Sequence, residues 1–208
     1  MSEKYINAYT NGFEFAFTER ISSRVFDVEI EVDVFEYSDK YNFREKAHVV
    51  LKKENLSYEC DLYDKHNYES DFYPVTLNSK RMICFRKTLY GFTFVNADTL
   101  TEEYEYYPKT VDDGGESFVI TDIKQLDDIL IFEGCYWACP YECFAYDYNG
   151  KRFYELSLEN GIVSLDKTLL QGEKIVIIGT DKNERQKEVT VSKQDIYLGI
   201  NKHGKTDF

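Results

Sequence analysis

The sequence has few of the residues on which most enzymatic and metal sites depend. Its 208 residues include three histidines, three prolines, two methionines and one tryptophan. The histidines form no HExxH or HxE motif, and no GxSxG segment supports a serine nucleophile. Gly114-Gly115 is followed by Glu116 and not by the Lys-Ser/Thr of a phosphate-binding loop. The sequence therefore disfavours nucleotide hydrolysis and Rossmann-type dehydrogenase chemistry.

The chain also lacks long hydrophobic runs. No stretch approaches the roughly 20 apolar residues that a helix needs to span a bilayer. The first residues, Met1-Ser-Glu-Lys-Tyr-Ile, have neither the basic nor the apolar part of a secretory signal. Because the five cysteines are an odd number and no signal precedes them, we expect free thiols in a reducing cytoplasm.

Positive charge is scarce. Lysine and arginine number 25 against 38 aspartates and glutamates, which gives a formal net charge of −13. A nucleic-acid binder needs cationic side chains that displace counterions, and an anionic membrane attracts cationic side chains in the same way. The composition therefore argues against direct nucleic-acid binding and against membrane binding. It is compatible with a basic protein partner.

Aromatic residues are plentiful at 16%, which is typical of half-buried strands. The clearest pattern lies between residues 26 and 34, where apolar and acidic residues alternate with a period of two. The apolar set is Phe26, Val28, Ile30, Val32 and Val34, and the acidic set is Asp27, Glu29, Glu31 and Asp33. This pattern predicts a strand with one apolar face and one carboxylate face.

Further short strands are predicted on both sides of this one. They cover 13–17, 47–53, 56–63, 81–86, 92–95, 103–107, 117–121, 129–132, 143–146, 152–156, 174–178 and 188–191. Residues 64–78, which include Pro74, show no clean period and are interpreted as a loop. Asn149-Gly150, between two of the strands, is a strong hairpin signal.

Helical signals are few. Residues 162–170 are ambiguous between a strand and a single helical turn. A short helix is expected over 192–198 with Ser192 as its N-cap, followed by a fraying tail from Gly199. The sequence therefore predicts a mainly β fold with few short helices.

The strands are expected to form antiparallel meanders, packed as a sandwich or as an incomplete propeller-like array. The second arrangement is suggested by two similar hairpins around Tyr90 and Tyr141. We expect a single mainly β domain over residues 1–208. A candidate seam near 64–78 would separate an N-terminal meander (1–65) from a repeat-like part (79–198).

The stretch 132–148 concentrates rare and reactive residues. Cys135, Cys139 and Cys143 are spaced by four, which matches neither the C-x₂-C zinc pattern nor the C-x₃-C-x₂-C pattern of radical SAM enzymes. In an extended strand, neighbouring Cα atoms of this set would be about 13 Å apart. A disulfide tolerates at most ~7 Å, so only a tight turn near Pro140 would bring the sulfurs together. Packed or surface thiols, a metal site and a reactive thiol are the three alternatives.

The same stretch holds an aromatic cluster that fits either a core or a binding surface. Its members are Tyr136, Trp137, Tyr141, Phe144 and Tyr146. Tryptophan and tyrosine fill β cores, and they are also enriched at binding hot spots. The loop character of 134–141 favours the surface, so Tyr136, Trp137, Tyr141 and Glu142 are candidate binding residues.

The carboxylate row Asp27, Glu29, Glu31 and Asp33 is the second candidate binding site. Four like charges in one row repel each other unless cations face them, and Lys46, Lys52 and Lys53 are the candidate cations of a neighbouring strand. The alternative is a surface for a basic partner or a mimic of nucleic-acid phosphates. A hydrolytic carboxylate pair is disfavoured, because a solvated flat strand does not raise one pKa selectively.

Three segments together resemble a group of uncharacterised bacterial β-rich proteins. They are Leu89-Tyr-Gly-Phe-Thr-Phe, Gly115-Glu-Ser-Phe-Val-Ile and Glu133-Gly-Cys-Tyr-Trp-Ala-Cys-Pro-Tyr-Glu. The resemblance covers roughly residues 80–160. It implies a β-rich intracellular bacterial protein and no particular chemistry.

These features predict a non-catalytic cytoplasmic protein without a cofactor, which binds a basic partner protein as an immunity, inhibitor or adaptor protein does. The first alternative is an enzyme with a site around Cys135–Glu142, formed by Cys135, Tyr136, Cys139 and Glu142 with Arg86 as an electrophile. The second alternative is a metal-binding module. The sequence does not specify an oligomeric state.

Overall fold

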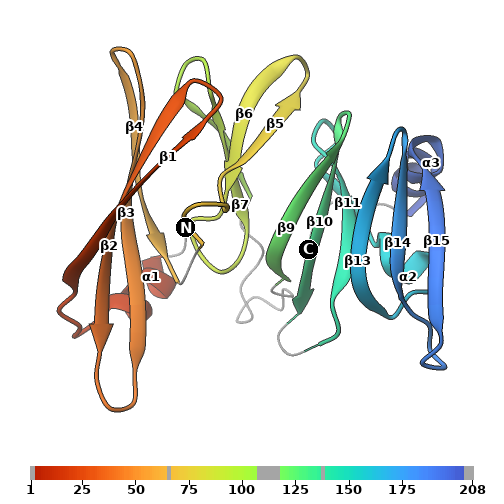
Figure 1. The fold of residues 1–208 in the computed structure, drawn as a ribbon, viewed down its shortest axis with the longest axis horizontal. Helices are drawn as coiled ribbons and strands as arrows, with labels where there is room; N and C mark the ends of the chain where they lie inside the picture. The colour runs from red at the N-terminus through yellow and green to blue at the C-terminus, as the bar shows by residue number, and fades with distance from the viewer. Residues whose placement is uncertain (1–2, 65–66, 107–117, 137–138, 204–208) are drawn as a thin grey trace. The chain divides into compact units, whose positions relative to one another are not determined.

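A computed structural model describes residues 3–64, 67–106, 118–136 and 139–203 (Figure 1). Strands account for 60% of the residues and helices for 11%, so the prediction of a mainly β fold is confirmed. The chain divides into two compact units, Met1–Tyr107 and Pro108–Phe208, and residues 64–78 lie within the first. Among the described helices, none has both the length and the apolar character needed to cross a membrane.

The first unit contains a short helix and two four-stranded antiparallel sheets, in which each strand pairs with its neighbour in sequence. The helix is α1 (Glu3–Thr10). Sheet A consists of β1 (Ala16–Val25), β2 (Val28–Ser38), β3 (Phe43–Lys53) and β4 (Leu56–Tyr63). Sheet B consists of β5 (Tyr73–Leu77), β6 (Lys80–Phe85), β7 (Phe92–Asn96) and β8 (Glu102–Tyr106).

The alternating pattern of β2 builds the core of the first unit. Val28, Ile30, Val32 and Val34 are at most 1% exposed, while the acidic residues between them point to the opposite face. The apolar side chains join Ile83, Phe85 and Val95 of sheet B in one cluster, so the two sheets share a core. Burying each such side chain contributes on the order of 1.5–3 kcal/mol before the entropy of ordering is counted.

Two of the segments predicted in the first unit, 13–17 and 64–78, differ from the sequence expectation. The strand predicted over 13–17 begins only at Ala16, so Phe13 and Phe15 precede it. The interpretation of 64–78 as a loop was wrong for its last part, because Pro74 lies within β5. This strand is at the edge of sheet B, where the missing N–H of a proline removes no ladder hydrogen bond.

The second unit is built from one four-stranded sheet, one three-stranded sheet and two helices. Sheet C consists of β9 (Phe118–Leu126), β10 (Ile129–Tyr136), β11 (Glu142–Asp147) and β12 (Arg152–Tyr154). Sheet D consists of β13 (Ser164–Gln171), β14 (Lys174–Thr180) and β15 (Gln186–Ser192), and the helices are α2 (Leu156–Glu159) and α3 (Lys193–His203). One core cluster contains Ile131 of sheet C, Ile177 of sheet D and Ile196 of α3.

The hairpin predicted at Asn149-Gly150 is confirmed, because β11 and β12 pair across it. The ambiguous segment 162–170 contributes most of strand β13.

The C-terminal helix begins as predicted and ends later. The Ser192 hydroxyl accepts the backbone N–H of Asp195 at 3.2 Å and donates to its carboxylate at 2.6 Å, which confirms the cap. The expected fraying from Gly199 was wrong for residues 199–203, and residues 204–208 lie outside the described ranges. Ile200 is 1% exposed, and a Cβ on Gly199 would overlap the ring of Tyr154. Close packing of the helix against β12 therefore carries α3 past that residue to His203.

Candidate binding face of sheet A

The outer face of sheet A carries the predicted carboxylate row. Along β2, Glu29, Glu31, Asp33, Phe35 and Tyr37 alternate with the buried core residues and therefore share the face that points away from the core. The row is thus acidic over its first half and aromatic over its second half. The pattern that predicted the strand also predicted this orientation.

Three of the four carboxylates are paired with cations of the neighbouring strands. The pairs are Arg24–Glu29 at 2.6 Å, Lys52–Glu31 at 2.6 Å and Arg20–Asp33 at 2.5 Å. The Arg20 guanidinium donates two hydrogen bonds to Asp33 and thereby lowers the pKa of that carboxyl. The expectation that a neighbouring strand supplies lysines holds for Lys52, whereas the arginines of β1 were missed. Their signal was present, since Arg20, Ser22 and Arg24 repeat with a period of two.

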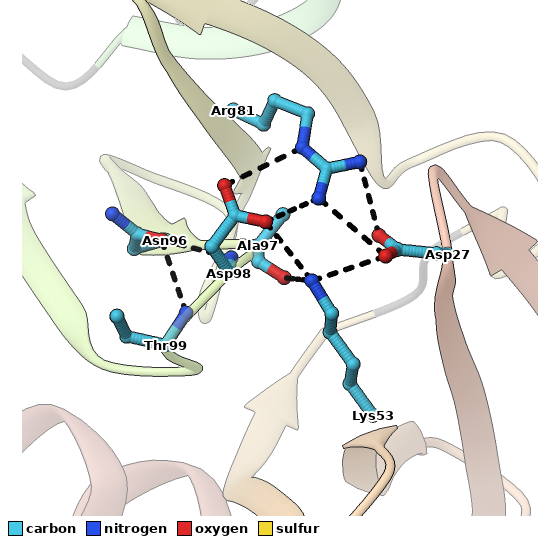
Figure 2. A network of polar contacts seen from close by, with 7 residues as sticks. All are labelled: Asp27, Lys53, Arg81, Asn96, Ala97, Asp98 and Thr99. Atoms are coloured by element: carbon cyan, nitrogen blue, oxygen red, sulfur yellow. Dashed lines mark hydrogen bonds and ion pairs between the residues drawn. The ribbon is translucent and has the colours of Figure 1, made fainter.

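The fourth carboxylate, Asp27, belongs to a charge network at the turn between β1 and β2. Figure 2 shows the cations of Lys53 and Arg81 between the carboxylates of Asp27 and Asp98. Lys53 lies 3.0 Å from Asp27 and 2.9 Å from Asp98, and Arg81 lies 3.2 Å from Asp27 and also contacts Asp98. The hydrogen bonds from Arg81 and Lys53 lower the pKa of Asp98 to about 2. Because Arg81 is on β6, this network joins sheet B to sheet A.

A shallow groove of about 390 Å³ lies across β1 and β2 at the charged end of the row. It is lined by Ser22, Ser23, Arg24, Glu29, Ile30 and Glu31. Glu29 keeps 58% of its side chain exposed and Arg24 keeps 62%, so their ion pair stays in contact with water. Two of the predicted binding residues, Glu29 and Glu31, therefore line this groove.

Five rings form the other end of the row, and we call Phe13, Phe15, Phe17, Phe35 and Tyr37 the aromatic end. The rings of Phe13 and Tyr37 are 4.3 Å apart, and Phe17 and Phe35 meet edge to face at 5.8 Å. Phe17 remains 56% exposed. Sequence reasoning missed this surface, because the phenylalanines at 13–17 were interpreted only as a strand pattern.

The aromatic end already holds one cation. The ammonium of Lys46 lies 5.0 Å from the ring centroid of Phe15 and 5.8 Å from that of Phe35. Lys46 was a candidate partner for the carboxylates, and it contacts rings instead. Glu14 and Glu19, which follow Phe13 and Phe17 closely in the chain, have no ion pair with another described residue.

The candidate binding residues of stretch 132–148 lie in the second unit, and they differ in packing and exposure. The Tyr136 ring packs against Phe118 at 5.0 Å and Phe144 at 5.9 Å. Tyr141 is 47% exposed, and Glu142 is half-buried opposite Gly134 in the β10–β11 ladder. Trp137 lies outside the described residues.

The three cysteines of that stretch are free and differ in burial. Cys143 is fully buried, Cys135 is half-buried and Cys139 is exposed. The N–H of Cys139 donates to the carbonyl of Tyr136 at 2.9 Å. Burial raises the pKa of Cys135 and raises that of Cys143 to about 12, so both thiols are less ionised near neutral pH than ordinary thiols. Within the described ranges, no group of three or more potential ligands is placed to hold a metal ion.

The electrophile suggested for an enzyme site, Arg86, belongs to the first unit. It is 9% exposed, and its guanidinium donates to the carboxylate of Asp71 at 3.3 Å. An arginine in this setting holds the segment before β5 against the end of β6. The ion pair with Asp71 accounts for the burial of this charge.

Comparison with known proteins found no matching protein-family model, no similar curated protein and no similar solved structure. The functional argument therefore depends on the geometry of the chain itself.

Proposed function

We propose that the chain is a non-catalytic binding protein, which docks a basic partner protein on the outer face of sheet A as an immunity, inhibitor or adaptor protein would. The observation that carries this proposal is the groove between β1 and β2, which is lined by Glu29 and Glu31 of the exposed carboxylate row. The net charge of −13 supports it, since it attracts a cationic partner from a distance.

The ion pairs within the row do not prevent such docking. Exposed pairs are screened by water and salt and contribute little to stability, so a partner cation can share or replace one. At the groove, the Arg24–Glu29 and Lys52–Glu31 pairs involve side chains that are each at least 35% exposed. An incoming guanidinium would find carboxylate oxygens that still face solvent.

The test is affinity capture of the tagged protein from its own host, followed by kinetics with the basic protein that co-purifies. The variant is Glu29→Lys with Glu31→Lys, and the matched control is Glu173→Lys with Glu188→Lys, two exposed acids of the second unit. Both variants change the net charge equally. We expect the row variant to lower the association rate at low salt by roughly tenfold or more, and the control to lower it only slightly.

Equal loss in both variants would mean that net charge alone attracts the partner, and the proposed face would be wrong. Capture of no stoichiometric basic protein would contradict the proposed function itself.

A further inference from the structure

The aromatic end lies directly beyond the charged part of the same row. On β2, Asp33 is followed on the outer face by Phe35, and alternate residues of a strand are about 6.5–7 Å apart. Phe17 of β1 is opposite Phe35 in the register and is 56% exposed. A ligand that extends along the carboxylates therefore reaches the exposed ring of Phe17 and the half-buried ring of Phe35 at its next contact.

Lys46 indicates that the aromatic end attracts cationic groups. Its ammonium lies over the rings of Phe15 and Phe35, at distances typical of a cation–π contact. On the same outer face, the carboxylate of Asp33 precedes Phe35 along β2 and adds negative charge next to the rings. The rings and this carboxylate together favour a positively charged group that also has a flat face.

We propose that the aromatic end binds arginine side chains of the partner, so that the docked segment is an extended, arginine-containing stretch of a basic protein. The inference rests on the proposed function and specifies its partner. A guanidinium is planar and weakly hydrated, so it stacks on a ring while its N–H groups reach carboxylates, whereas an ammonium does this less well. Arginines at alternate positions match the spacing of the row.

The experiment compares two fluorescein-labelled 12-residue peptides, one of alternating Arg-Ser and one of alternating Lys-Ser, which carry equal charge. Binding to the full chain is measured by fluorescence anisotropy in 150 mM salt. We expect the wild type to bind the arginine peptide about two- to five-fold more tightly than the lysine peptide for each stacked side chain.

The variants test the contribution of the Phe17 ring separately from that of the rest of the face. Phe17→Leu keeps an apolar side chain and removes the π face, and the exposure of Phe17 means that the fold tolerates the change. This variant should lose most of the preference for arginine, and Phe17→Tyr should keep it. Tyr41→Ala, at an 83% exposed ring beneath Lys40, is the control and should leave the preference unchanged.

The outcomes separate the two proposals. Equal affinity of the wild type for both peptides, or an arginine preference that persists in Phe17→Leu, would overturn arginine anchoring and leave the charged row as the docking site. Glu29→Lys with Glu31→Lys should weaken both peptides by a similar factor and preserve their ratio. Absence of binding to either peptide would contradict the proposed function as well.

Discussion

Each unit joins two sheets, and the two units do so with different kinds of polar contact. In the first unit, Asp27, Arg81 and Asp98, whose side chains are 38–50% exposed, join sheets A and B at a rim together with Lys53, which is 14% exposed. In the second unit, Glu133 of β10 is only 13% exposed. Its carboxylate accepts the backbone N–H of Thr168 on β13 at 3.0 Å, the hydroxyl of the same residue, and the ammonium of Lys124 at 2.6 Å.

The difference shows which of the two polar contacts depends on salt concentration and pH. Charges in water are screened by salt and titrate with pH, so the rim network aligns the two sheets without a large share of the stability. A largely buried carboxylate has lost its water, so its protein donors are required for the fold. The contact between sheets C and D should therefore be less sensitive to salt than the network between sheets A and B, and more sensitive to mutation.

The largest expected effect comes from the cores. Ile30→Ala in the first unit and Ile177→Ala in the second each remove a fully buried side chain and should cost about 2–5 kcal/mol. Cys84 and Cys143, both 0% exposed, report the opening of their own units to a thiol reagent. Each variant should speed labelling of the cysteine in its own unit by roughly 30-fold or more. Equal acceleration of both thiols by either variant would show that the two units unfold as one.

The next largest effect is expected at Glu133. Glu133→Leu leaves the N–H and hydroxyl of the buried Thr168 without their acceptor and should destabilise the second unit by about 2–3 kcal/mol. Thr168→Val removes only the hydroxyl contact and should cost about 1 kcal/mol. Urea unfolding followed by circular dichroism measures both. If Thr168→Val lowers the free energy of unfolding as much as Glu133→Leu does, the carboxylate is not the central acceptor of this contact.

The smallest effect is the pH dependence of the rim network. The pKa of Asp98 is lowered from 3.8 to about 2 by Arg81 and Lys53, and that of Asp27 is lowered by Lys53. A lowered pKa in the folded state means stability that is present above pH 3.8 and is lost as the pH falls toward 2. Asp98→Asn should therefore lower the urea midpoint at pH 5 and have little effect below pH 2.

The control for this titration is Glu54→Gln, at an exposed turn residue next to Lys53. Its midpoint should follow the wild type at both pH values. If the urea midpoint of Asp98→Asn stays below that of the wild type by the same amount below pH 2, side-chain shape and not charge joins the two sheets.

Local patterns were sufficient to predict the strands and the row. The alternation over 28–34 predicts both the strand and its carboxylate face, because a period of two assigns each side chain to one side of the sheet, whereas Phe26 and Asp27 lie in the turn before β2. The cap at Ser192 was likewise visible, since its contact to Asp195 spans three residues.

Contacts between distant residues were not visible in the sequence. Glu133 and Thr168 are 35 positions apart, and no spacing rule links a glutamate in one hairpin to a threonine in another. The aromatic end combines a segment before β1 with alternate residues of β2, and only the β1–β2 register brings Phe17 opposite Phe35. The helix α1 (Glu3–Thr10) was missed because its eight residues are too few for a sustained helical period.

The bulge in β1 affects how copies of this protein behave when they are crowded together. β1 is an edge strand of ten residues, and such an edge is a template on which another copy can extend the sheet into a filament. The register with β2 shifts between Phe17 and Glu19, which bends the strand. Arg20 and Arg24 on the same strand would also meet like charges on an approaching copy. The bulge and these arginines therefore oppose the addition of a second copy at the β1 edge.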